Sequence, residues 1–233
     1  HETWINTGDG DDEIRVGCSD VTAYKTLDDL AAPLVIAGGG GTDTIALIDV
    51  EDGTAGTETA VVSGSWVSGF GMAESAAVEH EGCERMEIIA SDPGGYDIAV
   101  QSTVIPTALE LGGGDDRVEM YAGSAVVAVN LGAGDDRFVV RACAAPVFVE
   151  GGEGEGDVLE VDATSNAAGL TGSLLDAAGG IHSLLSIAGL IEGATFAGVE
   201  EIHLGLGLGS DTFEIDTSYD RVLAVSGGGG DDR

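Results

Sequence analysis

Basic residues are nearly absent from this sequence. Lys25 is the only lysine, and 8 basic residues stand against 42 acidic ones, which gives a formal net charge of −34. Such a chain is repelled by nucleic acid and by anionic membrane surfaces, so neither is expected as a partner. Because the acidic residues recur at fixed positions of a repeated motif, they predict a cation partner rather than solubility alone.

Aromatic residues, proline and cysteine are also scarce. The chain has 5% aromatic residues and 4 prolines but 39 glycines, which favours strands and tight turns over helices packed by large side chains. Cys18, Cys83 and Cys143 are too few for a disulfide scaffold and match no zinc pattern, so free and intermolecular thiols both stay open. No apolar run reaches transmembrane length, and no signal peptide is visible. Since the chain begins at His1 and stops inside a motif at Arg233, we expect it to be an excerpt of a longer polypeptide.

A motif rich in glycine and aspartate recurs along the chain. Its clearest copies read Leu-Gly-Gly-Gly-Asp-Asp at 111–116 and Leu-Gly-Ala-Gly-Asp-Asp at 131–136, and looser copies end at Asp97 and Asp157. Successive key aspartates are 31, 54, 19, 20, 21, 54 and 21 residues apart. A step of about 20 residues suits one coil of two short strands and two turns, whereas the step of 31 indicates an insert and each step of 54 indicates two extra coils or an inserted hairpin. The key aspartates are Asp12, Asp43, Asp97, Asp116, Asp136, Asp157, Asp211 and Asp232.

The two long steps indicate a larger repeat. Asp43 and Asp157 are 114 residues apart, and so are Asp97 and Asp211. Asp116 and Asp232 are 116 residues apart, and segments 83–88 and 199–204 align loosely at the same separation. The chain is therefore predicted to be a single continuous domain, 1–233, with about two copies of a unit of about 115 residues, approximately 1–115 and 116–233.

Alternating apolar residues flank each motif. Val127 and Val129 precede one turn and Phe138 and Val140 follow it, with polar or small residues between most such pairs, as in a strand with one buried face. Residues 167–193 are read as strands rather than a helix, because the segment contains several glycines and aligns with 61–70. The predicted fold is all-β: a right-handed parallel β-solenoid with coils of about 20 residues and longer inserted segments.

Glycine allows strained backbone conformations in which carbonyl oxygens turn toward a common point, and the aspartate adds a carboxylate. When the turn repeats one coil later, oxygens from two levels surround a small space, which suits the 6–8 oxygen ligands of calcium better than the strict octahedron of magnesium. No His or Cys recurs at these positions, which argues against zinc or copper. With the key aspartates, the candidate calcium-binding residues are Gly8, Gly10, Gly39, Gly41, Gly112, Gly114, Gly132, Gly134, Gly152, Gly207, Gly209, Gly228 and Gly230.

The turn resembles the nonapeptide Gly-Gly-x-Gly-x-Asp-x-apolar-x of RTX proteins, most closely in the copies at Asp12, Asp43, Asp116, Asp136 and Asp211. The resemblance implies a β-roll with several calcium ions between stacked turns. RTX motifs recur every nine residues and line both edges of the roll, whereas here the step is about 20, so a single calcium-bearing edge is expected. Units like the one from Gly198 onward are similar to repeats of giant extracellular proteins, which implies a surface or fibre component.

The leading functional hypothesis is a non-enzymatic, calcium-stabilised structural module at the cell surface or outside the cell, in a fibre, surface layer or adhesin stalk, assembled with copies of itself or other chains. A module that binds polysaccharide, ice or cells is the alternative. A polysaccharide lyase or epimerase ranks lower, because it needs clustered basic residues and none are clustered in the sequence. A metal-free reading also stays open, in which the aspartates only accept hydrogen bonds from turn amides.

Overall fold

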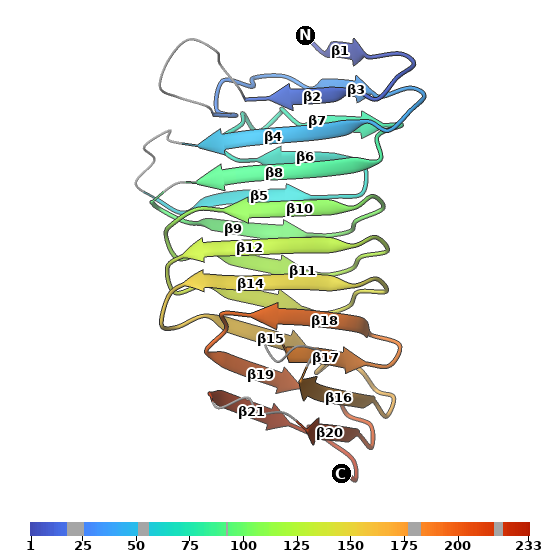
Figure 1. Ribbon diagram of the computed structural model, residues 1–233, viewed down its shortest axis with the longest axis vertical. Coiled ribbons are helices and arrows are strands. Elements are labelled where there is room, and N and C mark those ends of the chain that lie inside the picture. The colour runs from blue at the N-terminus through green and yellow to red at the C-terminus, as the bar shows by residue number, and fades with distance from the viewer. Residues whose placement is uncertain (18–25, 51–55, 92, 177–182, 217–220) are drawn as a thin grey trace.

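The computed structural model describes residues 1–17, 26–50, 56–91, 93–176, 183–216 and 221–233. These residues form strands and turns in two large, mostly parallel sheets, so the all-β prediction is confirmed (Figure 1). Within the described ranges there is no helix long and apolar enough to cross a membrane. Cys18 and Lys25 lie outside the described residues.

One sheet has 11 strands and runs the full length of the molecule. Its strands, in spatial order, are β1 (Thr3–Asn6), β3 (Leu34–Ala37), β7 (Val78–Glu81), β6 (Trp66–Gly69), β5 (Glu58–Val62), β9 (Tyr96–Val100), β11 (Arg117–Met120), β13 (Arg137–Val140), β15 (Val158–Asp162), β19 (Glu201–Gly205) and β21 (Val222–Ser226).

The other sheet has 10 strands and lies alongside the first (Figure 1). Its strands, in spatial order, are β2 (Glu13–Val16), β4 (Thr44–Val50), β8 (Arg85–Ser91), β10 (Thr107–Leu111), β12 (Val127–Ala133), β14 (Val147–Glu153), β18 (Ile191–Ala197), β17 (Ser183–Ile187), β16 (Thr171–Asp176) and β20 (Thr212–Asp216).

Most connections carry the chain from one sheet to the other. Neighbouring strands are therefore about one motif step apart and pair in parallel: Arg117 pairs with Arg137, and Val127 with Val147. We call one strand of each sheet, with the turn that joins them, a level. Residues at the same motif position stack directly from level to level, which places the predicted turns above one another.

Two three-stranded meanders interrupt this alternation. Strands β5, β6 and β7 pair antiparallel within the 11-stranded sheet, and β16, β17 and β18 do the same within the 10-stranded sheet. Each meander places three strands where regular alternation would have one, so two strands, which form a hairpin, are inserted. The meanders account for the two steps of 54 residues, and the inserted hairpin is the correct alternative. The strand interpretation of 167–193 is confirmed for its described residues, and 177–182 lie outside them.

The core lies between the sheets and is built from the alternating apolar positions. One row across the 11-stranded sheet consists of Ile98, Val118, Phe138, Leu159 and Ile202, each at most 1% exposed. Because each level contributes such residues, the buried apolar cluster runs continuously from Ile14 to Leu206. The core therefore holds the polar turns at the two edges in register.

Candidate functional site

The glycine–aspartate turns lie on both edges of the molecule, which corrects the expectation of a single edge. Turns ending at Asp12, Asp43, Asp211 and Asp232 leave the 11-stranded sheet, whereas those ending at Asp116, Asp136 and Asp157 leave the 10-stranded sheet. Because the parallel strands of each sheet run in one direction, the sheet that a turn leaves decides its edge (Figure 1). The motif spacing alone does not reveal which edge a turn occupies. Each step of 54 residues contains an odd number of strands, and an odd number places the next turn on the opposite edge.

Backbones of stacked turns approach too closely for any side chain. Gly39 has φ +98°, and a Cβ there would lie 1.9 Å from the carbonyl oxygen of Gly8. Gly152 stands in the same relation to Gly132, also at 1.9 Å. Backbone hydrogen bonds join the turns, as from Gly40 N–H to Gly8 O (3.0 Å). Of the predicted glycines, those with positive φ are Gly8, Gly10, Gly39, Gly41, Gly114, Gly132, Gly134, Gly152, Gly228 and Gly230.

The motif aspartates form a ladder of side chain to backbone contacts. Oδ1 of Asp136 accepts a hydrogen bond from Asp116 N–H (2.7 Å), and Oδ1 of Asp157 accepts one from Asp136 N–H (2.9 Å). We call Asp116, Asp136 and Asp157 the central column. On the opposite edge Asp43 receives Asp12 N–H and Asp232 receives Asp211 N–H, both at 2.9 Å. The structure thus brings seven of the eight predicted aspartates into three stacked groups.

Asp97 lies outside these groups. Asp116 Oδ1 accepts the N–H of Tyr96 at 2.6 Å, so Tyr96 takes the place in the stack that the sequence assigned to its neighbour. Asp97 pairs in register with Arg117 on the outer face and forms an ion pair with it at 3.2 Å. The looser motif copy is therefore displaced by one residue, because six residues (91–96) connect its paired strands where the regular turn has five (112–116).

Two glutamates that sequence reasoning missed close the ladders. Glu84 Oε2 accepts Asp43 N–H at 2.7 Å, and Glu200 Oε2 accepts Asp157 N–H at 3.1 Å. The two glutamates are 116 residues apart and occupy the second position of the aligned segments 83–88 and 199–204. The alignment of these two segments was the signal in the sequence that could have identified the glutamates. Both segments carry an acidic residue at the level where the glycine–aspartate motif is missing.

Unlike Asp211, whose Oδ2 accepts Gly207 N–H at 3.3 Å, five of the ladder carboxylates have a second oxygen that is buried without a hydrogen-bond partner. This holds for Oδ2 of Asp12, Asp43 and all three residues of the central column. Asp43, Asp116, Asp136 and Asp157 are 0–2% exposed. A buried acceptor without a partner is unfavourable, and an ionised one more so. The five oxygens lie above one another on their two edges, so the lack of a hydrogen-bond donor repeats from one level to the next.

Burial changes the proton affinity of the central column. Desolvation raises the pKa of Asp116 to about 7 and that of Asp136 to about 6, and it also raises the pKa of Asp157. The amide hydrogen bonds oppose this shift, and the neighbouring aspartates add to it. In the part of the chain that the structure describes, no three His, Cys, Asp or Glu side chains gather into a metal-binding cluster. Any ion at the column would be held by stacked pairs and backbone oxygens.

Without metal, the chain is expected to become more stable as pH falls from about 7 to about 4. In that window the folded chain holds protons on Asp116 and Asp136 that the unfolded chain, at the ordinary pKa of 3.8, has released. The free energy of unfolding therefore decreases as pH rises. Thermal melts in a chelator at about pH 5 and about pH 7.5 measure this slope.

The net negative charge of the chain also decreases as pH falls, and weaker charge repulsion would stabilise the folded state as well. A variant is therefore needed to separate the protonation of the two aspartates from general charge repulsion. The double variant Asp116→Asn/Asp136→Asn keeps most of the charge but loses both titrating groups, and its melting temperature is expected to depend less on pH. An equal slope in the parent and the variant would assign the effect to general charge repulsion.

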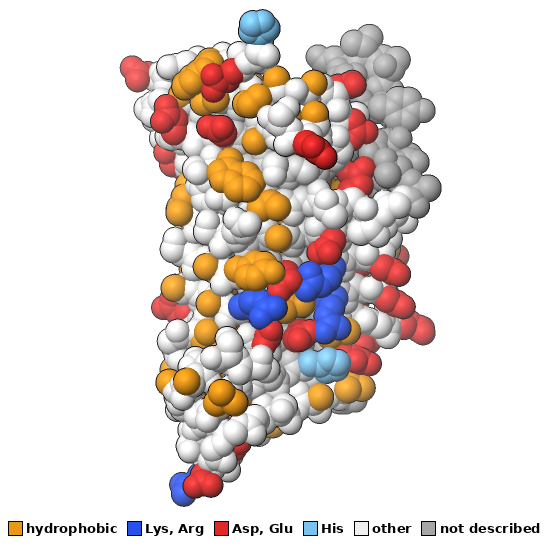
Figure 2. All heavy atoms as spheres, turned by 180° about the vertical axis from the view of Figure 1, so that it is seen from behind, with side chains coloured by type: hydrophobic (Ala, Val, Ile, Leu, Met, Phe, Trp, Pro, Cys, Tyr) orange, Lys and Arg blue, Asp and Glu red, His pale blue; other side chains and the backbone are white. Residues whose placement is uncertain are grey.

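Three arginines gather on the outer face of the 11-stranded sheet, although the sequence suggested no basic cluster (Figure 2). Glu119 bridges Arg117 at 2.6 Å and Arg141 at 2.7 Å, and Arg137 is paired with Glu160. Each guanidinium is thus neutralised by a carboxylate. The patch consequently ties neighbouring strands together and offers little net positive charge to an acidic sugar.

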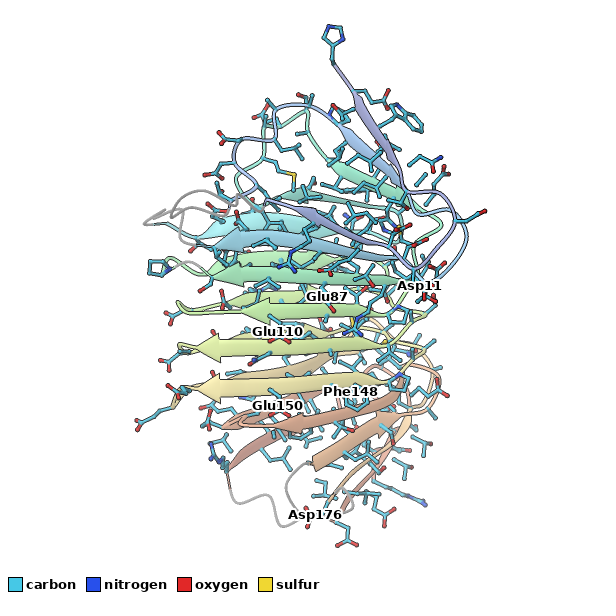
Figure 3. The ribbon with its side chains drawn as sticks, turned by 45° about the horizontal axis from the view of Figure 1, so that its top comes forward. Asp11, Glu87, Glu110, Phe148, Glu150 and Asp176 are labelled. Atoms are coloured by element: carbon cyan, nitrogen blue, oxygen red, sulfur yellow. The ribbon has the colours of Figure 1, made fainter. Side chains whose placement is uncertain are left out.

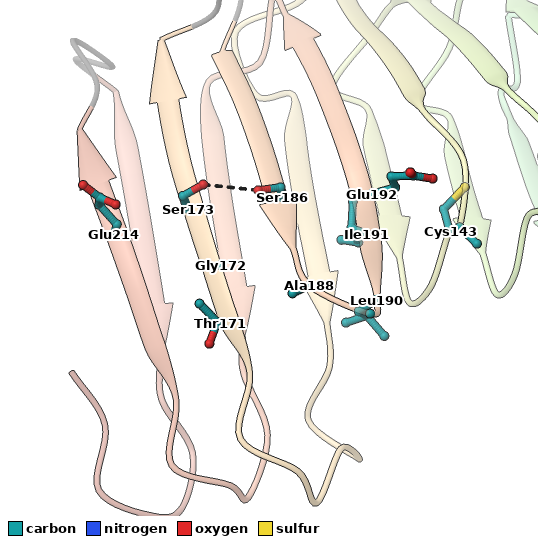
Figure 4. A pocket seen from close by; sticks show the side chains of 12 residues that line it. Cys143, Thr171, Gly172, Ser173, Ser186, Ala188, Leu190, Ile191, Glu192 and Glu214 are labelled. Atoms are coloured by element: carbon teal, nitrogen blue, oxygen red, sulfur yellow. Dashed lines mark hydrogen bonds between the residues drawn. The ribbon is translucent and has the colours of Figure 1, made fainter.

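A shallow hollow of about 640 Å³ lies on the outer face of the second meander (Figure 4). Ser173 and Ser186 hydrogen-bond across its floor at 3.2 Å, with Glu192 and Glu214 on either side. The glutamates stand on β18 and β20, three strand steps apart. That separation is about 14 Å, beyond the 5–9.5 Å of the carboxylate pairs that cleave glycosidic bonds.

On the described strands of the 10-stranded sheet, acidic side chains and an exposed aromatic ring stand on the outer face. Glu110, Asn130 and Glu150 form one exposed row, and Phe148 is 46% exposed in the adjacent row (Figure 3). The regular row of aromatics or threonines that would favour a glycan- or ice-binding face does not occur on these described strands. The chain matches no model of a known protein family and no curated protein.

Proposed function

We propose that this chain is a calcium-stabilised structural module, built as a parallel β-solenoid, of an extracellular fibre, surface layer or adhesin stalk. The solenoid is supported by the two mostly parallel sheets, because the chain passes from one sheet to the other at nearly every level. The continuous core and the near-uniform turns support a structural role rather than a catalytic one.

The observation that carries the proposal is the row of buried Oδ2 atoms without hydrogen-bond partners. Neighbouring levels are separated by about 4.8 Å, which is close to twice a calcium–oxygen distance of about 2.4 Å. A cation between levels would therefore lie at bonding distance from two stacked carboxylates. It would also reverse the repulsion between Asp116 and Asp136, which is worth a few kcal/mol at an effective dielectric constant of about 20.

The proposed ligands are the stacked aspartates and carbonyl oxygens of the glycine turns. In the central column these are Asp116, Asp136 and Asp157, with Glu200 closing the row. Asp12, Asp43 and Glu84 form the corresponding group on the opposite edge, and Asp211 and Asp232 form a third. An oxygen-only set suits calcium, and the resemblance to RTX turns points to the same ion.

An extracellular location follows from the same proposal. Ion sites of extracellular modules bind calcium at about 10⁻⁴–10⁻³ M, a concentration range suited to permanent occupancy outside the cell. A net charge of −34 gives the chain a strong general attraction for divalent cations. Calcium would thus serve both to neutralise the chain and to stiffen it.

Direct binding tests the proposal. Isothermal titration calorimetry of the chelator-treated protein with calcium chloride is expected to show more than one ion per chain, and magnesium is expected to bind more weakly because it demands stricter geometry. Equal heats for the two ions would indicate only diffuse attraction to an acidic surface. An absence of saturable calcium binding at millimolar concentration would exclude the proposal.

A further inference from the structure

The same group of contacts occurs twice, on opposite edges of the molecule. In the first copy Asp43 O accepts Glu84 N–H at 2.9 Å, and a Cβ on Gly38 would lie 2.2 Å from Gly82 O. In the second copy Asp157 O accepts Glu200 N–H at 2.9 Å, and a Cβ on Gly151 would lie 2.0 Å from Gly198 O. The two copies share their local structure but face opposite ways.

Equivalent strands of the two copies accordingly lie in opposite sheets. In the first copy, β3 and β9 belong to the 11-stranded sheet, and β4 and β8 belong to the 10-stranded sheet. In the second copy the assignment is reversed: the counterparts β14 and β20 belong to the 10-stranded sheet, and β15 and β19 belong to the 11-stranded sheet. Eleven strands, β3 to β13, separate the start of one copy from the start of the next. Because that number is odd, the second copy begins in the other sheet and is turned by half a revolution about the long axis.

The half-turn also exchanges the positions of the meanders. In the first copy, β3 to β9 takes four strand steps in the 11-stranded sheet, whereas β4 to β10 takes two in its partner. In the second copy, β14 to β20 takes four steps in the 10-stranded sheet, and β15 to β21 takes two. Each meander thus lengthens one sheet by two strand spacings, and the two meanders lengthen different sheets.

An uncompensated meander would bend the stack. Two extra spacings are about 10 Å, and packed sheets are themselves about 10 Å apart, so one sheet would have to fan out by tens of degrees for each unit. We infer that the half-turn between units keeps the stack straight, because each unit cancels the excess length of the one before it. The structural repeat of this fold is then a pair of units. This inference depends on the strand order and is independent of calcium.

Distances between spin labels along each sheet test the inference. One pair is placed at Trp4 and Ala224 in the 11-stranded sheet, and the other at Arg15 and Glu214 in the 10-stranded sheet, in a background without native cysteines; all four residues are exposed. The two distances, measured by double electron–electron resonance, are expected to agree within about one strand spacing of 5 Å. A difference of two spacings or more in the parent chain would overturn the inference, whatever the variants do.

Deleting one meander's extra strands should unbalance the sheets. Removal of residues 168–189 leaves a connection as long as that at 141–146 and is expected to shorten the Arg15–Glu214 distance by about 10 Å while the Trp4–Ala224 distance stays unchanged. Removal of 54–75 should do the reverse, and the double deletion should shorten both. A single deletion that retains the strand signal in circular dichroism but shortens both distances equally would also overturn the inference.

Discussion

Removal of calcium is expected to lower the melting temperature by about 10–20 °C, given that one ion at a hundred times its dissociation constant contributes about 2.7 kcal/mol and that each kcal/mol shifts a domain of this size by about 2–4 °C. The estimate takes two ions, one for each interval of the central column. The physical reason is the row of buried Oδ2 atoms without hydrogen-bond partners, whose negative charge a bound cation would neutralise.

Differential scanning calorimetry at neutral pH, with calcium and then with excess chelator, measures this shift. Magnesium at the same concentration is the control, because it screens surface charge equally but fits a carbonyl-rich turn less well. Melting temperatures that agree in calcium, magnesium and chelator would show that the ladder is stable with its amide contacts alone.

Replacement of Asp136 by asparagine is expected to have opposite effects with and without calcium. In calcium the variant should be less stable by about 3–5 kcal/mol, because Asp136 contributes to the intervals on both sides of it and most of two ions' stabilisation is lost. In chelator it should be more stable by about 1–3 kcal/mol, because the amide keeps the acceptor for Asp116 N–H while the unpartnered buried charge disappears.

Asp29→Asn is the matched control, since it makes the same chemical change at an exposed position outside the columns. Its stability should change little in either condition. Urea unfolding in both conditions gives the four free energies needed. An Asp136→Asn variant that is destabilised equally with and without calcium would show that the carboxylate acts only through its amide contact.

Local patterns were sufficient for the strands and the turns. Alternation around Val127 and Phe138 predicted β12 and β13, and the glycine turn between them is where the structure has it. Seven of the eight aspartates stack on a neighbour in the motif series, because parallel strands place equal motif positions above one another, but they form three groups on two edges rather than the predicted single row.

Sequence reasoning failed where a contact depended on pairing between distant segments. Tyr96 rather than Asp97 occupies the stack because the register with β11 places Asp97 opposite Arg117. Glu84 and Glu200 resemble ordinary surface acids until the ladder brings them against Asp43 and Asp157. The arginine cluster likewise arises only when positions about 20 residues apart are stacked.

The sequence by itself therefore determined the all-β class, the step of about 20 residues and the residues that build each turn, because alternation and glycine turns are properties of a few neighbouring residues. The tertiary structure alone decided which edge each turn occupies, which sheet each meander lengthens and which oxygens are left buried without partners. These features depend on the number of strands between repeats and on register across the sheets, and both are set by packing around the common core.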